Sequence, residues 1–314
     1  MYGLVKKMFD IAGKRFQFFL ISGVVILIGI ISLLTVGLKT GVEFSSGSLL
    51  TVDFEQAVAR DELKAALADL GHSNVIIQRT GAGDYLIRTG ELNDEEKKEL
   101  EAGLEARFGK LTEPEFSSVS PMIATETVRT AVIAVAVAAV GILLYVTWAF
   151  RRMPRPFHYG TCAIIALIHD ALVALGIFSI LGGILNWQVN MMFITGILAV
   201  IGYSVNNTVV IFDRIRENLR LDINADFETV VNNSMVETLG RSINTSLTTL
   251  IVVLALMFFV GTTIQNLVVV LIIGIIAGTF SSICIAPTLL VVWDKKEWRR
   301  FISWLPFRWA KAGE

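Results

Sequence analysis

Residues 190–220 read NMMFITGILAVIGYSVNNTVVIFDRIRENLR. The first two-thirds of this stretch is apolar enough to cross a bilayer, yet it contains Tyr203 and the adjacent amides Asn206 and Asn207. An unpaired amide in hydrocarbon costs several kcal/mol, so we expect both amides to find partners on other helices. We interpret the pair either as interhelical hydrogen bonds or as part of a transport or coupling path.

Small residues recur at helical spacing in two apolar stretches and predict faces along which a second helix approaches closely. The first row continues into Asn206, so a neighbouring helix would meet the amides there. The second row indicates helix packing and says nothing of activity. The first row is Gly196, Ala199 and Gly202, and the second is Gly274, Gly278 and Ser282.

The composition places the chain among polytopic membrane proteins. It has 314 residues, of which 54% are hydrophobic and 18% charged, with a mean hydropathy of +0.65. A net charge of -1 argues against a nucleic-acid partner. Cys162 and Cys284 fall in apolar stretches and behave as small apolar residues. Without a GxxxxGK loop or a His/Cys ligand spacing, we expect no cofactor, no metal and no enzymatic activity.

Six apolar runs are each near the ~20 residues that cross a bilayer core. The first is too long for a signal peptide and lacks a cleavage site, so we expect it to remain as an anchor helix. Residues 213–241 are expected to form a loop between the fourth and fifth spans. At its start, Asp213 and Arg216 are three residues apart on a helix and can form an ion pair. Alternatively, these two residues and Arg214 are simply the solvated end of that helix. The predicted spans are 16–38, 127–150, 160–185, 190–212, 242–263 and 267–293.

Residues 39–126 form a charged, water-exposed domain between the first and second spans. The order of its predicted elements is βαββαβ, which is typical of a ferredoxin-like α+β sandwich. Asn93 is expected to cap the second helix, and residues 81–84 to form a turn. The strands are predicted at 48–54, 74–79, 85–89 and 115–119, and the helices at 55–70 and 93–109.

Lysine and arginine gather at the N-terminus, at 151–155, at 214–241 and after the sixth span, whereas the short loops at 186–187 and 261–266 have none. The positive-inside rule therefore places both terminal segments, 1–15 and 294–314, in the cytoplasm and the 39–126 domain outside, in the periplasm of a bacterium. The C-terminal segment is expected to lie on the inner leaflet of the inner membrane. Its tryptophans are Trp298, Trp304 and Trp309.

The third span contains Asp170, preceded by His169, near its middle. A carboxylate there costs about 2.5–3.5 kcal/mol to insert, so it should face the bundle interior. We interpret Asp170 as a proton-relay residue or as a group held by a structural hydrogen bond to a neighbouring helix, such as one to Asn206 or Asn207.

The fifth span begins near Arg241, and Asn244, Thr245 and Thr248 follow on one helical face. This polar stripe is expected to meet Asn207 and Asp170 across the bundle. Alternatively, Arg241 extends to the cytoplasmic surface as a boundary anchor.

Three motifs resemble the SecD/SecF family of the bacterial Sec protein-export machinery, in particular its SecF members. The most specific is IGYSVNNTVVIFDRIREN at 201–218. GVEFSSGS at 41–48 is similar to the family's GIDFTGGT turn, and His169-Asp170-Ala-Leu is similar to its HDV-like motif. One span, an exported domain and five further spans are also the layout of half a resistance-nodulation-division (RND) transporter.

The resemblance implies a subunit that uses the proton or sodium gradient to promote late steps of protein translocation. It implies a SecD-like partner, a SecYEG-type channel with its associated subunits, an unfolded polypeptide client and a surrounding lipid bilayer. Structural or conformational roles would then fall on Gly41, Glu43, Gly47, Gly202, Tyr203, Asp213, Arg214 and Arg216.

Two positions depart from the family pattern. The family usually has Asn-Asp where this chain has Asn206-Asn207, and an amide cannot gain or lose a proton at any working pH. Coupling would then rest on Asp170 or on a carboxylate of the partner. Ser46 stands where the family turn usually has glycine, whereas Arg241 matches a basic family position.

Two other functions fit the same sequence. One is a half-size RND-type exporter of lipids or small molecules, although a domain of about ninety residues is small for a substrate pocket. The other is a structural translocon subunit without ion coupling, which Asn207 makes credible.

Overall fold

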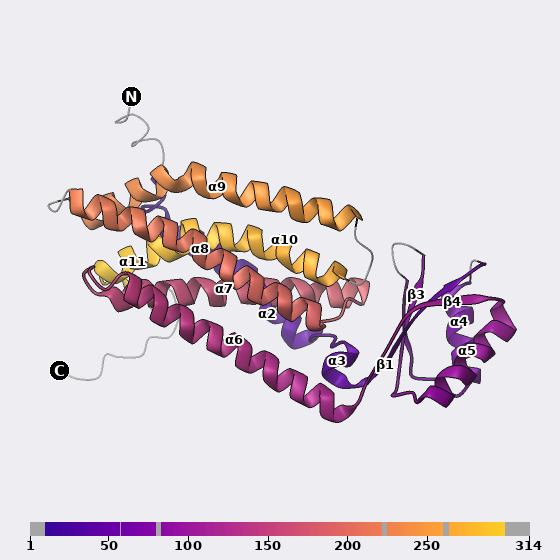
Figure 1. The fold of residues 1–314 in the computed structure, drawn as a ribbon. Coiled ribbons are helices and arrows are strands. Elements are labelled where there is room, and N and C mark those ends of the chain that lie inside the picture. Colours follow the sequence, from indigo (N-terminus) through magenta and orange to yellow (C-terminus); the bar gives the residue numbers. More distant parts are fainter. Residues whose placement is uncertain (1–9, 57, 80–82, 222–224, 260–263, 299–314) are drawn as a thin grey trace, which may run out of the picture.

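The computed structural model describes residues 10–56, 58–79, 83–221, 225–259 and 264–298 (Figure 1). Most of the predicted N-terminal segment, part of the turn at 81–84, part of the loop at 261–266, and Trp304 and Trp309 of the predicted tail lie outside these residues.

Six helical segments are long and apolar enough to cross a membrane, as the sequence predicted. The sixth segment is continuous but is built from three consecutive elements. The segments are α2 (Arg15–Thr35), α6 (Pro121–Ala149), α7 (Pro156–Leu185), α8 (Met191–Leu221), α9 (Phe227–Phe259) and Gln265–Asp294.

The sixth span changes its helical pitch in the middle. It consists of α10 (Gln265–Phe280), the π-helical turn η2 (Ser281–Ile285) and α11 (Ala286–Asp294). In η2 the amide of Ala286 donates to the carbonyl of Ser281, five residues earlier. Pro287 follows directly and has no N–H for the carbonyl of Ile283, so an ordinary α-helical ladder cannot continue there.

The α+β domain between α2 and α6 has the predicted ferredoxin-like order of elements. Its antiparallel sheet has the strand order β2-β3-β1-β4. Asn93 accepts hydrogen bonds from the amides of Glu95 and Glu96, which confirms the predicted cap. The elements are β1 (Gly47–Phe54), α4 (Arg60–Asp69), β2 (Ile76–Arg79), β3 (Tyr85–Thr89), α5 (Asp94–Phe108) and β4 (Leu111–Val119).

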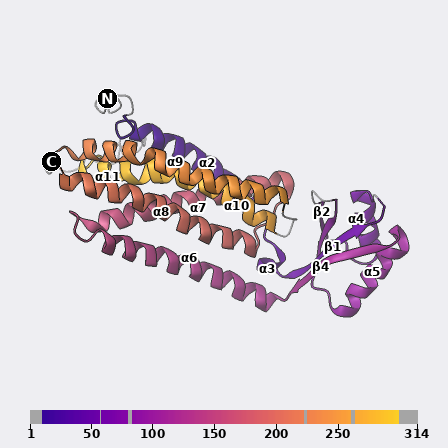
Figure 2. The ribbon, with the colours of Figure 1, turned by 45° about the horizontal axis from the view of Figure 1, so that its top comes forward.

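The domain lies at one end of the helix bundle, which we call the domain end, and the described ends of the chain lie toward the opposite, far end (Figures 1 and 2). The hydrophobic windows of α7, α8 and the sixth span are each 50% buried, against 6–17% for α2, α6 and α9. The first three therefore form the core of the bundle, and the last three present faces to lipid or to partner helices.

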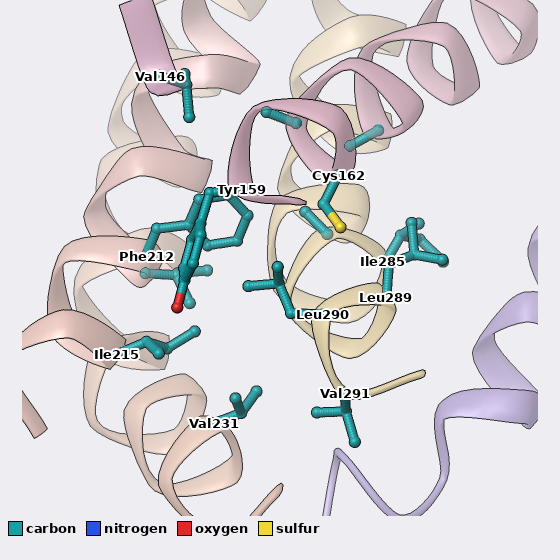
Figure 3. Packing of buried hydrophobic residues seen from close by; sticks show 14 of the residues in the cluster. Val146, Tyr159, Cys162, Phe212, Ile215, Val231, Ile285, Leu289, Leu290 and Val291 are labelled. Atoms are coloured by element: carbon teal, nitrogen blue, oxygen red, sulfur yellow. The ribbon is translucent and has the colours of Figure 1, made fainter. Parts of the chain in front are cut away.

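Aromatic and aliphatic side chains fill the bundle near its far end (Figure 3). Tyr159 of α7 packs edge-on against Phe212 of α8, with ring centroids 5.3 Å apart, and stacks on Phe150. Leu290 of α11 and Val231 of α9 belong to the same cluster. The buried members of this cluster come from α6, α7, α8, α9 and the sixth span, so they hold five of the spans together independently of any polar contact.

Glycines allow the closest helix crossings. A Cβ on Gly176 of α7 would lie 2.6 Å from the Cα of Gly29 in α2. Gly274 and Gly278 of the sixth span face Val200 and Ser204 of α8, which confirms that packing face. On α8, Gly196 is buried, but Ala199, Gly202 and Asn206 are exposed. No helix of this chain therefore covers the predicted row beyond Gly196, and within the chain that prediction was wrong.

The connection between α8 and α9 is mostly helical, so the loop predicted at 213–241 was wrong. The described helices run to Leu221 and resume at Phe227. At ~1.5 Å per residue both helices exceed a ~30 Å bilayer core, so their ends project beyond it. Asp213 pairs with Arg216, and Arg214 pairs with Glu237 of α9 at 2.8 Å.

The segment that joins α2 to the domain is pinned to the bundle. Thr40 forms an isolated parallel bridge with Val189 in the connection between α7 and α8. The amide of Gly41 donates to the carbonyl of Val189, and the amide of Val189 donates to the carbonyl of Lys39, both at 2.7 Å. A short helix, α3 (Val42–Ser45), replaces the predicted turn and leads into β1.

Ser46 ends α3 with φ 62° and ψ 168°, and Gly47 follows with φ 115°. The first conformation is populated essentially by glycine and costs another residue about 1–3 kcal/mol. A Cβ on Gly47 would also collide with the carbonyl oxygen of Thr89, so glycine is required there.

We predict that Ser46→Gly raises the free energy of unfolding by about 1 kcal/mol, because the strain exceeds the entropy that glycine adds to the unfolded chain. The measurement is thermal unfolding of the detergent-solubilised chain. Ser45→Gly is the matched control and should destabilise, since the Ser45 hydroxyl donates to the carbonyl of Gly41 at 2.8 Å. A lower melting temperature for Ser46→Gly would contradict the strain.

Candidate intramembrane polar site

Asp170 lies at the middle of α7 and is 1% exposed. Its Oδ2 accepts hydrogen bonds from the hydroxyls of Ser204 on α8 at 2.6 Å and Ser281 of η2 at 2.9 Å. Nδ1 of His169 lies 2.9 Å from Oδ1. Three neighbours thus satisfy a carboxyl group that would otherwise be very costly to bury.

The π-helical turn directs two consecutive hydroxyls to two different helices, Ser281 to α7 and Ser282 to α8. Ser281 bonds Asp170, while the next hydroxyl, that of Ser282, donates to the carbonyls of Gly278 at 2.5 Å and Ser204 at 3.1 Å. Thr208 of α8 donates to Oγ of Ser282 at 3.1 Å. A Cβ on Gly278 would lie 3.0 Å from Cβ of Ser204, so the glycine lets α8 approach this turn.

Asn207 belongs to a second cluster, between α8, α9 and α10. It is 3% exposed, and its Nδ2 lies 3.4 Å from Oγ of Ser246 on α9. The hydroxyls of Tyr203 and Thr279 also bond Ser246, at 3.0 and 2.6 Å. We call these four residues the Asn207 cluster, and Asp170 with His169, Ser204 and Ser281 the Asp170 cluster.

The two clusters are separate hydrogen-bond networks in the described residues. Within the described residues no hydrogen bond joins Asp170 to Asn206 or Asn207, so the predicted direct contact was wrong. The sixth span connects them instead, since Thr279 belongs to one cluster and Ser281 to the other. A shift at the π-helical turn would therefore move hydroxyls in both.

The polar stripe predicted on α9 faces away from the bundle. Arg241, Asn244, Thr245 and Thr248 are exposed, and the two threonine hydroxyls bond carbonyls of their own helix. Ser242 and Ser246 point inward in their place. The prediction that the stripe meets Asp170 and Asn207 was wrong, because the period of a helix defines a face but not its direction.

The sequence reasoning missed Ser246, Thr279 and Ser281. Each hydroxyl is small and can bond its own helix, so it gives a weak signal by itself. The stronger signal was Pro287, because a proline inside a span frees a carbonyl in the preceding turn. In the described part of the chain no group of His, Cys, Asp and Glu side chains could hold a metal ion.

Comparisons with known proteins agree with this architecture. The family described as "Protein export membrane protein SecD/SecF, C-terminal" matches residues 99–296. Proteins named "Protein translocase subunit SecF" from Thermobaculum terrenum and Anaerolinea thermophila are 42% and 41% identical, over 93% and 94% of this chain and 96% and 97% of theirs. "Protein translocase subunit SecDF" of Bacillus subtilis is 32% identical, over 93% of this chain and 39% of that longer protein.

Solved structures show the same fold. A crystal structure of SecDF, described as a translocon-associated membrane protein from Thermus thermophilus, has a TM-score of 0.83 at 31% identity and covers 91% of this chain and 39% of that one. SecDF in a super-membrane-facing form has a TM-score of 0.63 at 29% identity and covers 94% and 40%.

The fold and these matches define a multi-pass membrane protein of a protein-transport class, which is not an enzyme class. The chain belongs to the SecD/SecF family, among its SecF translocase subunits.

We predict that Gly278→Val lowers the free energy of unfolding by about 1–3 kcal/mol. The added methyl groups would collide with Ser204 and Asp170, and α8 could move away only by disrupting its packing in the core of the bundle. Gly141→Val on α6 is the control, since a Cβ there has nothing within 4 Å. Thermal unfolding of both variants in detergent makes the comparison. Equal stability of the two variants would show that the close approach at Gly278 is not required.

Proposed function

We propose that this chain acts with a SecD-like partner to use the proton gradient, or a sodium gradient, to promote late steps of protein translocation across the bacterial inner membrane. The observation that carries the proposal is the Asp170 cluster, a buried carboxyl group held by hydroxyls from two other spans. Membership in a family of translocase subunits favours this function over export of lipids or small molecules.

The orientation proposed from the sequence is supported by where charges lie along the bundle. Arg15 begins α2, Arg155 precedes α7, Arg220 lies in the last turn of α8 and Lys295 follows α11. Figure 1 shows these helix ends at the far end of the bundle. The connection at 186–190, at the domain end, has no lysine or arginine. The far end is therefore proposed to be cytoplasmic and the α+β domain periplasmic.

Protonation of Asp170 would change the hydrogen bonds that hold the core spans together. As a carboxylate it only accepts, and both serine hydroxyls donate to Oδ2. A protonated carboxyl group becomes a donor: a proton on Oδ2 would require at least one serine hydroxyl to rotate or withdraw, whereas a proton on Oδ1 would make Oδ1 the donor toward Nδ1 of His169. A hydrogen bond to a charged group contributes about 1.5–3 kcal/mol, and moving one charge through 100 mV supplies about 2.3 kcal/mol. The gradient is therefore large enough to bias such a switch.

A shift of α7 or α8 has a direct route to the α+β domain. The connection between these helices contains Val189, which is hydrogen-bonded to Lys39 and Gly41 on the segment that leads into β1. Movement of the domain relative to the bundle would follow from movement of these helices.

The outward polar stripe on α9 supports a partner inside the membrane. Arg241 and Asn244 are exposed, and so is Asn206 on the neighbouring α8. Polar side chains that face lipid are costly, up to about 2.5–3.5 kcal/mol for an arginine at the centre of a span, so helices of the SecD-like subunit are proposed to cover this face. SecDF relatives, in which the matched region is part of a longer chain, support the same pairing. A SecYEG-type channel and an unfolded polypeptide complete the proposed assembly.

We predict that Asp170→Asn abolishes the part of export that depends on the gradient and spares the part driven by ATP, because an amide keeps the shape but cannot titrate. The measurement is export of a secretory precursor into inverted membrane vesicles at fixed ATP, with and without a proton-motive force. Asp294→Asn, at an exposed carboxylate that ends α11, is the control and should keep the dependence. Unchanged gradient dependence in Asp170→Asn would leave the chain a structural subunit.

A further inference from the structure

One face of the domain's sheet is free of helices. Helices α4 and α5 cover the face that carries Leu50, Val52 and Ile87, and these side chains are buried. The strand register places Leu49 opposite Arg88 on the other face. Figures 1 and 2 show that this second face is turned toward the domain end of the bundle.

A cavity of about 240 Å³ lies between this sheet face and the bundle. The sheet contributes Leu49, Gln78 and Leu86, and the bundle contributes Trp187, Gln188 and Gln265. We call this cavity the sheet–bundle cleft. Its volume is below the ~300–1,000 Å³ of typical small-molecule pockets, so it fits a short part of a longer molecule better than a complete ligand.

The polar groups of the cleft match a peptide backbone. Gln78, Gln188 and Gln265 are half-buried, and within the described residues their amides have no hydrogen-bond partner. Each amide offers both a donor and an acceptor, as each peptide group does. Leu86 and Trp187 add apolar surface that can contact side chains of any sequence.

Charges of both signs surround the cleft in equal number. Its lining includes Arg79 and Arg88, and also Glu43 and Glu115. Arg88 is fixed by hydrogen bonds to the carbonyl of Thr40 and the hydroxyl of Ser45. A site for a phosphate group would be expected to carry a net positive charge, and a site for an acyl chain would be expected to be apolar. A lining with equal numbers of positive and negative side chains instead tolerates peptide segments of varied charge.

We propose that the sheet–bundle cleft holds a short extended segment of the translocating polypeptide. The proposal rests on the proposed function and identifies the surface on which the client is held. A peptide segment in the cleft contacts the sheet and the bundle at the same time. Tilting of the domain relative to the bundle would therefore change these contacts and the strength with which the segment is held. Arg88, which ties the sheet to the Thr40 segment, lies at this joint.

Site-specific photocrosslinking tests the assignment in the intact translocase. The photoreactive residue p-benzoylphenylalanine replaces Leu86 in the cleft or, as the matched control, Lys98, which is exposed on α5. The probe is a secretory precursor stalled during export by a tightly folded C-terminal domain. We expect a precursor adduct at position 86 in several-fold excess over position 98.

Any other pattern overturns the assignment. Adducts of position 86 only with the SecD-like subunit would make the cleft a subunit interface, and adducts only with lipid would make it a lipid site. Equal precursor adducts at both positions would show mere proximity. If Asp170→Asn abolishes gradient dependence while position 86 gives no precursor adduct, the proposed function stands and the cleft assignment fails.

Discussion

The structure depends on satisfying one buried carboxyl group. Asp170 is inaccessible to water, and its three neighbours come from α7, α8 and the π-helical turn of the sixth span. These are the spans that form the core of the bundle. Breaking one of these bonds leaves a polar group unpaired in a medium without water, which is costly, so the three spans are expected to move together.

The π-helical turn makes this arrangement possible. Pro287 prevents a regular ladder, and the local change of pitch brings Ser281 to Asp170 and Ser282 to the carbonyl of Ser204. Thr279, two residues before Ser281, reaches Ser246 in the Asn207 cluster. The sixth span thus contributes a hydroxyl to the Asp170 cluster and another to the Asn207 cluster. π-Helical turns often mark functional sites, and this one joins the two polar clusters.

Much of this could be predicted from the sequence. The six spans and the ferredoxin-like domain follow from hydrophobic length and from alternating patterns, and the burial of Asp170 follows from the cost of exposing it to lipid. The direction of the α9 stripe could not be predicted, because Arg241 and Ser242 are neighbours and periodicity does not say which face meets α8. The serine contacts were also hard to predict, since Pro287 indicates an irregular turn in the sixth span but does not say which side chains that turn brings to Asp170.

The central claim is that protonation at Asp170 changes how the α+β domain sits on the bundle. Spin labels at Lys98 on α5 and Ile184 near the domain end of α7, both exposed, would report the distance between them in proteoliposomes that contain the SecD-like partner. The account predicts two distance populations whose ratio shifts when a proton gradient is imposed, and no shift in Asp170→Asn. A single unchanging distance, or a shift that persists in Asp170→Asn, would contradict it.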